Sequence, residues 1–340
     1  MLVAIAAPCV AYLPTLPYGF VFDDRPLLIE NPIVQSPRGF SEIFTTDLDP
    51  QARTHEAPST NYLRPLFLAF AAGLHNLFGA QPFGWHLVTI VLHGLLGGLG
   101  FWVLRHEGLG LASALAASLL FSLHPSHVQS AAWVSGLQDL LFAVLALLAY
   151  LAYRTSTERP RAQAGRLLTL GVSYALALLA KEPAVGLFLF ALAETLFVVP
   201  STATNQEKPR RAWAELATLL LVTAGYFAYR LAVLGEIAHR FPTAPPFLTA
   251  LASVPLAVLA YLRDTVAPLD LFLLHPARPV ASALAPKAFA ALAGLLVLAA
   301  LALWAIRRRP QLARPLFWFT AWLAPALALW AVNPEWMVMD

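Results

Sequence analysis

The sequence predicts an all-α, polytopic integral membrane protein built as a bundle of transmembrane helices. Hydrophobic residues make up 59% of the 340 residues and charged residues only 12%, so the chain lacks the charge to cover a water-facing surface. Apolar runs that approach the length of a membrane-crossing helix recur between charged clusters. Lys and Arg gather in alternate connections between these runs, as they do in cytoplasmic loops.

The apolar runs predict about nine membrane spans. The first run, 2–15, has no basic region before it and no small-residue cleavage signal after it, so we expect a retained span rather than a signal peptide. The predicted spans are 2–15, 83–104, 109–123, 137–153, 167–180, 183–199, 212–233, 288–306 and 312–332.

Two further runs predict helices that do not cross the membrane. The run 247–266 contains Pro255, Arg263 and Asp264, and it would break the alternation of Lys and Arg if it crossed. We expect a re-entrant or interfacial helix there. The run 65–78 is short and apolar on one face, which predicts an amphipathic helix on the outer surface.

The basic residues also predict the orientation of the chain. Twelve of the 22 Lys and Arg lie in the connections around 105, 154–166, 208–211 and 307–314, which are therefore expected in the cytoplasm. The segment 17–64 then becomes the first outer loop of a single membrane domain over 1–340. Scattered basic residues argue against nucleic acid binding, and one cysteine, Cys9, allows no internal disulfide.

An acidic pair, Asp23-Asp24, follows the first predicted span. Adjacent carboxylates repel each other, which raises the pKa of one of them and suits it to accept a proton from an attacking hydroxyl. The alternative is a hydrated loop with a helix cap, because Asp is common in caps and turns.

A second polar group lies where the third and fourth predicted spans meet. His124 and His127 can donate hydrogen bonds to a phosphate, and Asp139 can fix a histidine tautomer. Two histidines and a carboxylate can also bind a divalent metal. No third ligand lies close to the two histidines in the sequence, so a metal is not favoured. Ordinary interfacial histidines are the remaining alternative.

Cations on the predicted outer side form the third candidate group. Lys181-Glu182 separates two apolar runs, Arg64 precedes a proline, and Arg278 follows the predicted loop 270–275. Arginine can hold a phosphate with two hydrogen bonds. The alternatives are a simple ion pair for Lys181-Glu182 and a contact with lipid headgroups for Arg64.

Five motifs in order carry a family resemblance: GFVFDDRPLLIENPIV, NYLRPL, FGWHLVTIVLHGL, LFSLHPSHVQSAAWVSGLQDLLFAVL and LALLAKEPAVGL. The chain resembles protein O-mannosyltransferases of the TMTC type and, more distantly, bacterial polytopic glycosyltransferases of the GT-C class. The resemblance implies a GT-C-like fold, a sugar donor linked to a polyprenyl phosphate, and a catalytic base from the acidic pair. Animal members carry a tetratricopeptide array after the membrane domain, so we expect a membrane core that is cut short.

The expected reaction is an inverting transfer of mannose or a similar hexose from the polyprenyl phosphate to a hydroxyl of a protein, glycan or lipid acceptor. A base facing the sugar opposite the phosphate gives inversion, as in inverting glycosidases. Asp23 is the expected base, and Asp24 is expected to tune it or to bind the acceptor. The residues expected around the phosphate are Lys181, Arg64, His124, His127 and Arg278, supported by Glu182 and Asp139.

Two other functional classes fit the same sequence. One is a transporter or flippase of a lipid-linked sugar, and the other is a truncated homologue without activity. The feature that separates them is whether Asp23 faces a pocket that Lys181 and His124 also line. The lipid-linked sugar is the expected donor substrate, and a divalent metal is an alternative that the sequence does not favour. The preference for Arg over Lys and the abundance of Ala and Leu suggest a bacterial inner membrane with the site facing the periplasm.

Overall fold

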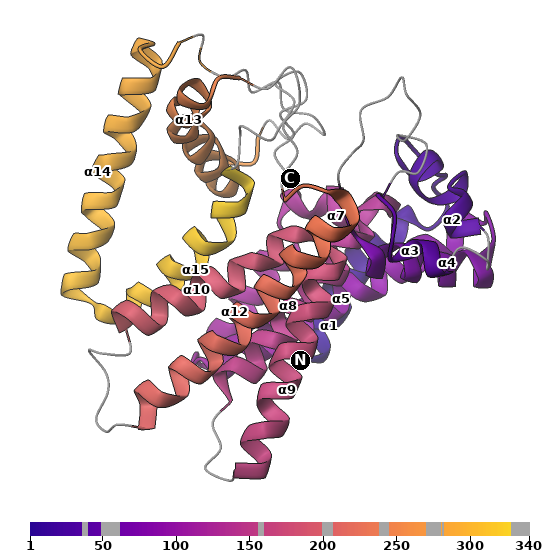
Figure 1. Cartoon of the computed structure of the whole chain (residues 1–340), viewed down its shortest axis with the longest axis horizontal. Coiled ribbons are helices and arrows are strands. Elements are labelled where there is room, and N and C mark those ends of the chain that lie inside the picture. The colour runs from indigo at the N-terminus through magenta and orange to yellow at the C-terminus, as the bar shows by residue number, and fades with distance from the viewer. Residues whose placement is uncertain are drawn as a thin grey trace. The chain divides into compact units, whose positions relative to one another are not determined.

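The computed structural model describes residues 1–35, 40–48, 62–155, 160–198, 207–237, 245–269, 280 and 282–327. Within these ranges the regular structure is entirely helical (Figure 1). Several of the helices are apolar and long enough to cross a bilayer. The prediction of an all-α polytopic membrane protein is therefore confirmed.

The helices follow the apolar runs of the sequence closely. Proline occupies the first turn of α4, α5 and α14, where its missing N–H costs no helical hydrogen bond. The α-helices are α1 Leu2–Tyr12, α2 Pro32–Gln35, α3 Phe40–Ile43, α4 Pro65–Phe78, α5 Pro82–His106, α6 Leu111–Ser122, α7 Val128–Ala132, α8 Leu137–Arg154, α9 Pro160–Ala180, α10 Gly186–Ala193, α12 Glu207–Leu234, α13 Phe247–Val266, α14 Pro286–Arg308 and α15 Ala313–Leu323. Short 3₁₀ or π turns are η1 Leu13–Thr15, η2 Arg25–Ile29, η5 Pro125–His127, η6 Val134–Gly136, η7 Glu182–Val185, η8 Glu194–Val198, η9 Pro310–Leu312 and η10 Ala324–Leu327.

The described residues give fewer spans than the nine that the sequence predicts. Six helices can cross a bilayer by length and composition, namely Pro82–His106, Val134–Arg154, Arg161–Ala180, Pro209–Leu234, Phe247–Val266 and Pro286–Arg308. A seventh is the pair Leu111–Ser122 and Pro125–Ala132, which is bent by 50°. The first predicted span, at 2–15, is only a shorter apolar helix.

Two other predictions are corrected by the helix lengths, and a third is made more specific. The run 183–199 is divided into η7, α10 and η8, and the described part of 312–332 into η9, α15 and η10, so neither forms a long helix. The run 247–266 is one continuous helix, α13, that includes Pro255 and passes the length and composition test for a span. The helix is not broken at that proline, and its position at the membrane interface, the other alternative that the sequence offered, stays a prediction.

Contacts divide the chain into two compact units. Unit 1 comprises 1–184 and 218–237, and unit 2 comprises 185–217 and 238–340. Within unit 2, α10 packs on α15 and α13 packs on α14; Arg314 Nε also donates to Glu194 Oε1 over 2.8 Å. All candidate residues except Arg278 belong to unit 1.

Unit 1 is organised around α5, which contacts α1, α6 and α8, while α8 packs along α9. Glycines on one face of α5 allow the close approach of α1. A Cβ on Gly97 would lie 2.5 Å from the Ala4 carbonyl oxygen, and one on Gly94 would lie 2.3 Å from Cys9 Sγ. Small residues serve the same purpose where other membrane helices approach closely.

Gly97→Ala is expected to destabilise unit 1, because the added methyl group meets the Ala4 carbonyl oxygen of α1, a backbone atom that cannot rotate away. Overpacking of this kind costs about 1–3 kcal/mol. Gly100→Ala on the same helix is the control, since a Cβ there meets nothing within 4 Å and alanine favours the helix. Thermal unfolding in detergent should show a lower Tm for Gly97→Ala only; equal Tm values would contradict this account of the packing.

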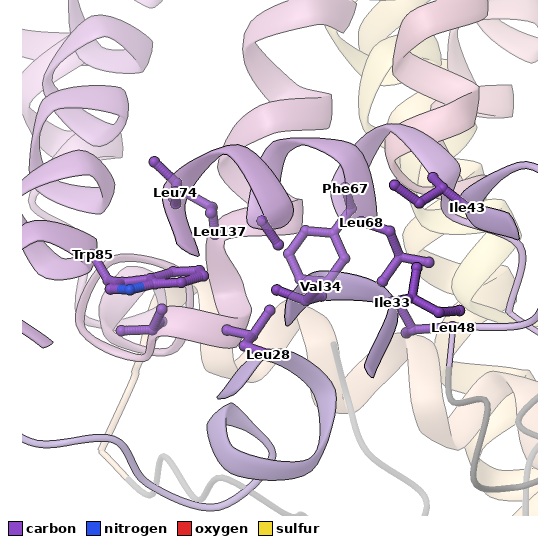
Figure 2. Close-up of a cluster of buried hydrophobic side chains, with 12 residues drawn as sticks. Leu28, Ile33, Val34, Ile43, Leu48, Phe67, Leu68, Leu74, Trp85 and Leu137 are labelled. Carbon is purple, nitrogen blue, oxygen red and sulfur yellow. The ribbon is translucent and has the colours of Figure 1, made fainter. Parts of the chain in front are cut away.

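A small hydrophobic core fixes the first loop to the helix bundle. Figure 2 shows Leu28 close to Val34 and Phe67, with Trp85 on one side and Ile33 and Leu48 on the other. The buried members come from η2, α2, α3, α4, α5, η6 and α8, together with Leu48 after α3. The predicted helix at 65–78 is α4, and its apolar face contacts α2 and α9. The segment that follows the acidic pair is therefore a packed part of unit 1.

Candidate active site

The acidic pair lies in a tight turn between η1 and η2. The Asp24 N–H donates to the Val21 carbonyl oxygen over 3.0 Å, and the Val21 N–H donates to Asp24 Oδ2 over 3.0 Å. Phe22 in this turn has a φ of 46°, a left-handed conformation that is strained for a bulky residue. Strain of this kind persists where the surroundings hold it and is common at functional sites.

Asp24 is anchored to the start of α8. Its Oδ1 accepts two hydrogen bonds from Ser135, one from the backbone N–H and one from Oγ, each 2.7 Å long. The side chain is fully buried. Burial raises the pKa of Asp24, although its hydrogen bonds with Val21 and Ser135 favour the charged form. Asp23 is only half-buried, so it is the more accessible acid of the pair.

The segment 135–139 connects the acid to the predicted cations. Its Ser135 holds Asp24, its Gln138 accepts a hydrogen bond from Arg64 Nη1, and Asp139 Oδ1 lies 2.6 Å from Lys181 Nζ. Asp139 also lies in the first turn of α8, where a carboxylate is favoured by the helix dipole. Three groups far apart in the sequence therefore meet on one short stretch of chain.

Gly136 allows this segment to take its position. A Cβ on Gly136 would lie 2.5 Å from the Gln129 carbonyl oxygen and 2.8 Å from the Ser130 Cα. Its φ of −67° is open to any residue, so only the close approach of the α7 backbone requires glycine here. The position of Ser135 and Gln138 depends on that contact.

Two arginines and one glutamate form a buried cluster beside the segment 135–139, which we call the arginine–glutamate cluster (Arg64, Glu182 and Arg230). Arg64 Nε and Nη2 lie 3.0 and 2.9 Å from Glu182 Oε2. Arg230 Nη1 lies 3.3 Å from Glu182 Oε1. Both arginines are 6% exposed. The cluster therefore holds two arginines away from water beside a glutamate that is partly exposed.

The predicted pair Lys181-Glu182 does not pair internally in the described contacts. Lys181 binds Asp139 of α8, while Glu182 binds Arg64 before α4 and Arg230 of α12. Asp139 therefore has a lysine as its described partner, where the sequence suggested that it fixes a histidine tautomer. Cross-helix pairs place these charges at one site.

Sequence reasoning missed Ser135 and Gln138 as contacts and Arg230 as a member of the site. Ser135 and Gln138 are common polar types in a segment read only as the mouth of a span. Arg230, however, lies within the predicted span 212–233, and a charged residue inside an apolar run is by default a functional candidate. That signal was sufficient to find it.

Three candidate spans have an end at this site. α8 begins at Leu137 beside Gln138, α9 ends at Ala180 before Lys181, and α12 ends at Leu234, one turn beyond Arg230. Gly235, with a φ of 77°, reverses the chain so that the Ile237 carbonyl oxygen accepts a hydrogen bond from Arg230 Nε over 2.7 Å. The charges therefore lie at the ends of three apolar helices that are long enough to cross a bilayer.

The histidines make other contacts. His124 Nδ1 lies 2.7 Å from Ser126 Oγ, and the His127 ring lies 4.5 Å from the Phe121 ring and 5.7 Å from the His93 ring. The structure thus brings together Asp24, Arg64, Asp139, Lys181 and Glu182, and it places His124 and His127 in a different set of contacts. Arg278 lies outside the described residues. Among the described residues, no group of three His, Cys, Asp or Glu side chains is arranged to hold a metal ion.

Comparison with known proteins agrees with the motifs. The chain is 35% identical over 188 residues to the Drosophila melanogaster protein O-mannosyl-transferase Tmtc1, covering 55% of the chain and 22% of that protein. It is 33% identical over 161 residues to human protein O-mannosyl-transferase TMTC1, covering 45% and 18% of the two chains. About half of the chain is homologous to the TMTC-type protein O-mannosyl-transferases. The resemblance to TMTC-type proteins that the motifs suggested is confirmed.

The TMTC homology also reaches human protein O-mannosyl-transferase TMTC2, which is 26% identical over 222 residues, or 61% of the chain and 25% of that protein. The chain spans about a fifth to a quarter of the length of these TMTC relatives. No family model matches the chain, and no solved structure matches it.

Proposed function

We propose that the chain is a membrane glycosyltransferase that moves mannose or a similar hexose from a polyprenyl phosphate to a hydroxyl acceptor. The observation that carries this proposal is the segment 135–139, which holds the acid Asp24 at one end and contacts Arg64 and Lys181 at the other. The names of the TMTC relatives support mannose as the sugar and a protein as the acceptor.

The proposed chemistry is a single displacement at the anomeric carbon of the sugar. The acceptor oxygen bonds to that carbon, its proton passes to Asp23, and the bond to the phosphate oxygen breaks with its electron pair leaving on the phosphate. Asp24 fixes the turn that presents Asp23. Arg64 and Lys181 stabilise the charge that develops on the leaving phosphate, and attack opposite that group inverts the anomeric centre.

The position of the charges supports a lipid-linked donor. They lie where α8, α9 and α12 end, so a polyprenyl tail can stay among apolar helices while its phosphate reaches the cations. On the predicted topology this end faces away from the cytoplasm, which in a bacterium is the periplasm. As the sequence suggested, the residues that remain candidates for binding the donor phosphate are His124, His127 and Arg278.

The proposal is tested by transfer in a purified system. The full chain in nanodiscs is given radiolabelled mannosyl polyprenyl phosphate or a mannose nucleotide, together with a Ser/Thr-rich peptide, and labelled peptide is counted. We expect label from the lipid donor only. Proteoliposomes that move the lipid-linked sugar across the bilayer but transfer nothing would favour a flippase, and a bound donor with neither activity would favour an inactive homologue.

Ser135→Ala is expected to move the acidic limb of the pH–transfer profile to higher pH. The Ser135 hydroxyl donates to the Asp24 carboxylate and so lowers its pKa, which burial has already raised; losing that donor raises the pKa further. Protonated Asp24 accepts the two remaining hydrogen bonds, from the N–H groups of Val21 and residue 135, less strongly, and the turn that presents Asp23 loosens. Ser41→Ala, at an exposed serine of the same loop, is the control. An unchanged limb in Ser135→Ala would contradict this role of Asp24.

A further inference from the structure

Glu182 occupies the arginine–glutamate cluster in the manner of an anionic ligand. One carboxylate oxygen takes the Nε and Nη2 fork of Arg64 and the other takes Nη1 of Arg230. A phosphate group has oxygens that can meet the same two guanidinium groups. The carboxylate is thus an internal anion bound between two arginines.

The two arginines are also held by contacts that do not involve Glu182. Arg64 donates to Gln138, and its guanidinium carbon lies 4.3 Å from the centre of the Tyr62 ring. Arg230 Nε donates to the Ile237 carbonyl oxygen over 2.7 Å. A different anion would therefore find both guanidinium groups already in place, which lowers the cost of binding.

Glu182 is the more accessible and more easily moved partner. Its side chain is 23% exposed, against 7% for each arginine side chain. It also lies in the short turn η7 and not within a long helix. Removing the carboxylate from two buried arginines is costly unless another anion takes its place.

We propose that Glu182 is an exchangeable internal carboxylate, which occupies a two-arginine site until the phosphate of a polyprenyl-phosphate lipid displaces it. This inference rests on the proposed function and adds Arg230 to the residues that bind the donor phosphate. The exchange leaves both arginines in contact with an anion at every stage. The released carboxylate turns toward water.

The exchange also explains how the site favours transfer over simple binding. The donor phosphate is a diester with a single charge, and the product phosphate is a monoester that carries about 1.5 to 2 negative charges near neutral pH. Two arginines therefore bind the leaving group more strongly than the donor, which is the differential binding that accelerates a reaction. Glu182 then returns to the arginines and expels the product.

The test measures binding of undecaprenyl monophosphate, the sugar-free product, to the full chain in phosphatidylcholine nanodiscs. We expect Glu182→Gln to bind it roughly tenfold more tightly, because a competing charge is lost, and Arg230→Gln to bind it at least roughly tenfold more weakly. The control is Glu107→Gln, which removes the carboxylate bound to Arg154. Arg154 is the last residue of α8, whose first turn lies at the site, so this variant should leave binding unchanged. Weaker binding by Glu182→Gln would overturn the exchange and make Glu182 a fixed support.

Kinetics give a second readout that a supporting role would not produce. Glu182→Gln should keep its single-turnover transfer rate while its steady-state rate falls, because product release becomes limiting. A fall in both rates would overturn the proposal. If Glu182→Gln does not fold, Glu182→Asp keeps the charge but shortens its reach, and it should also bind the monophosphate more tightly than the wild type; weaker binding would overturn the exchange.

Two further comparisons complete the test. One distinguishes a polyprenyl phosphate from other sources of phosphate, and the other distinguishes this proposal from the proposed function. Inorganic phosphate or phosphatidylglycerol that displaces undecaprenyl monophosphate at equal concentration would overturn the assignment to a polyprenyl phosphate. Tight binding with the expected variant order, but no transfer by the wild type, would retain the site and reject the proposed function. Transfer by the wild type, with weaker binding by Glu182→Gln and tighter binding by Arg230→Gln, would retain the proposed function and reject the exchange.

Discussion

Asp23→Asn is expected to lower the rate of sugar transfer by about a thousandfold, which is within the range that a general base contributes. The amide has nearly the same shape as the carboxylate but cannot accept the proton of the acceptor hydroxyl. Asp23 is half-buried, and the amide fills nearly the same volume as the carboxylate, so the substitution creates no cavity. We therefore expect normal expression, an unchanged Tm and retained binding of the lipid donor.

The neighbouring acids provide the controls for this experiment. Glu30→Gln changes an exposed acid of the same loop, whose described partner is Arg25 at 3.9 Å, and it should transfer sugar at a rate close to that of the wild type. Asp24→Asn should lose activity together with stability, because an amide nitrogen faces an N–H donor at Val21 or Ser135. Full transfer in Asp23→Asn with loss confined to Asp24→Asn would move the base to Asp24.

Gly136→Ala is expected to cause the second large effect, a loss of transfer by about a hundredfold with lower stability. The new Cβ meets the backbone of Gln129 and Ser130, so η6 must shift by a few tenths of an ångström or more. That shift moves Ser135 and Gln138 together and misaligns the acid and the cation, and misplacement of about 1 Å costs about a hundredfold in rate. Transfer assays at matched protein levels and thermal unfolding measure both effects.

A second glycine at a helix start makes the comparison specific. Gly110 precedes α6 with a φ of −59°, as Gly136 precedes α8 with a φ of −67°, but a Cβ on Gly110 meets nothing within 4 Å. Gly110→Ala should therefore be neutral in both assays. If Gly136→Ala were also neutral, the segment 135–139 would not owe its position to the contact with α7.

Hydropathy predicted where most helices lie but not how many long ones there are. The runs at 83–104 and 137–153 became α5 and α8, because an apolar segment of that length satisfies its backbone hydrogen bonds only as a helix in lipid. The run 183–199 did not become one long helix. Its polar residues include Glu194, which is buried and pairs with Arg314, and local tertiary contacts of this kind decide where a helix breaks.

The sequence by itself determined the membrane class, the order of the apolar segments and the motifs shared with TMTC relatives, since each depends on composition and local pattern. It also pointed to the acidic pair and to Lys181, Glu182 and Arg64, because charges next to apolar runs are costly and conspicuous. Only the tertiary structure decided the partners. It separated Asp24, buried against Ser135, from the half-buried Asp23, and it joined Glu182 to Arg230 across 48 residues of sequence. Pairing of distant charges depends on which helix ends meet. Helix packing is set by residues far apart in the sequence, so a local hydropathy pattern cannot predict it.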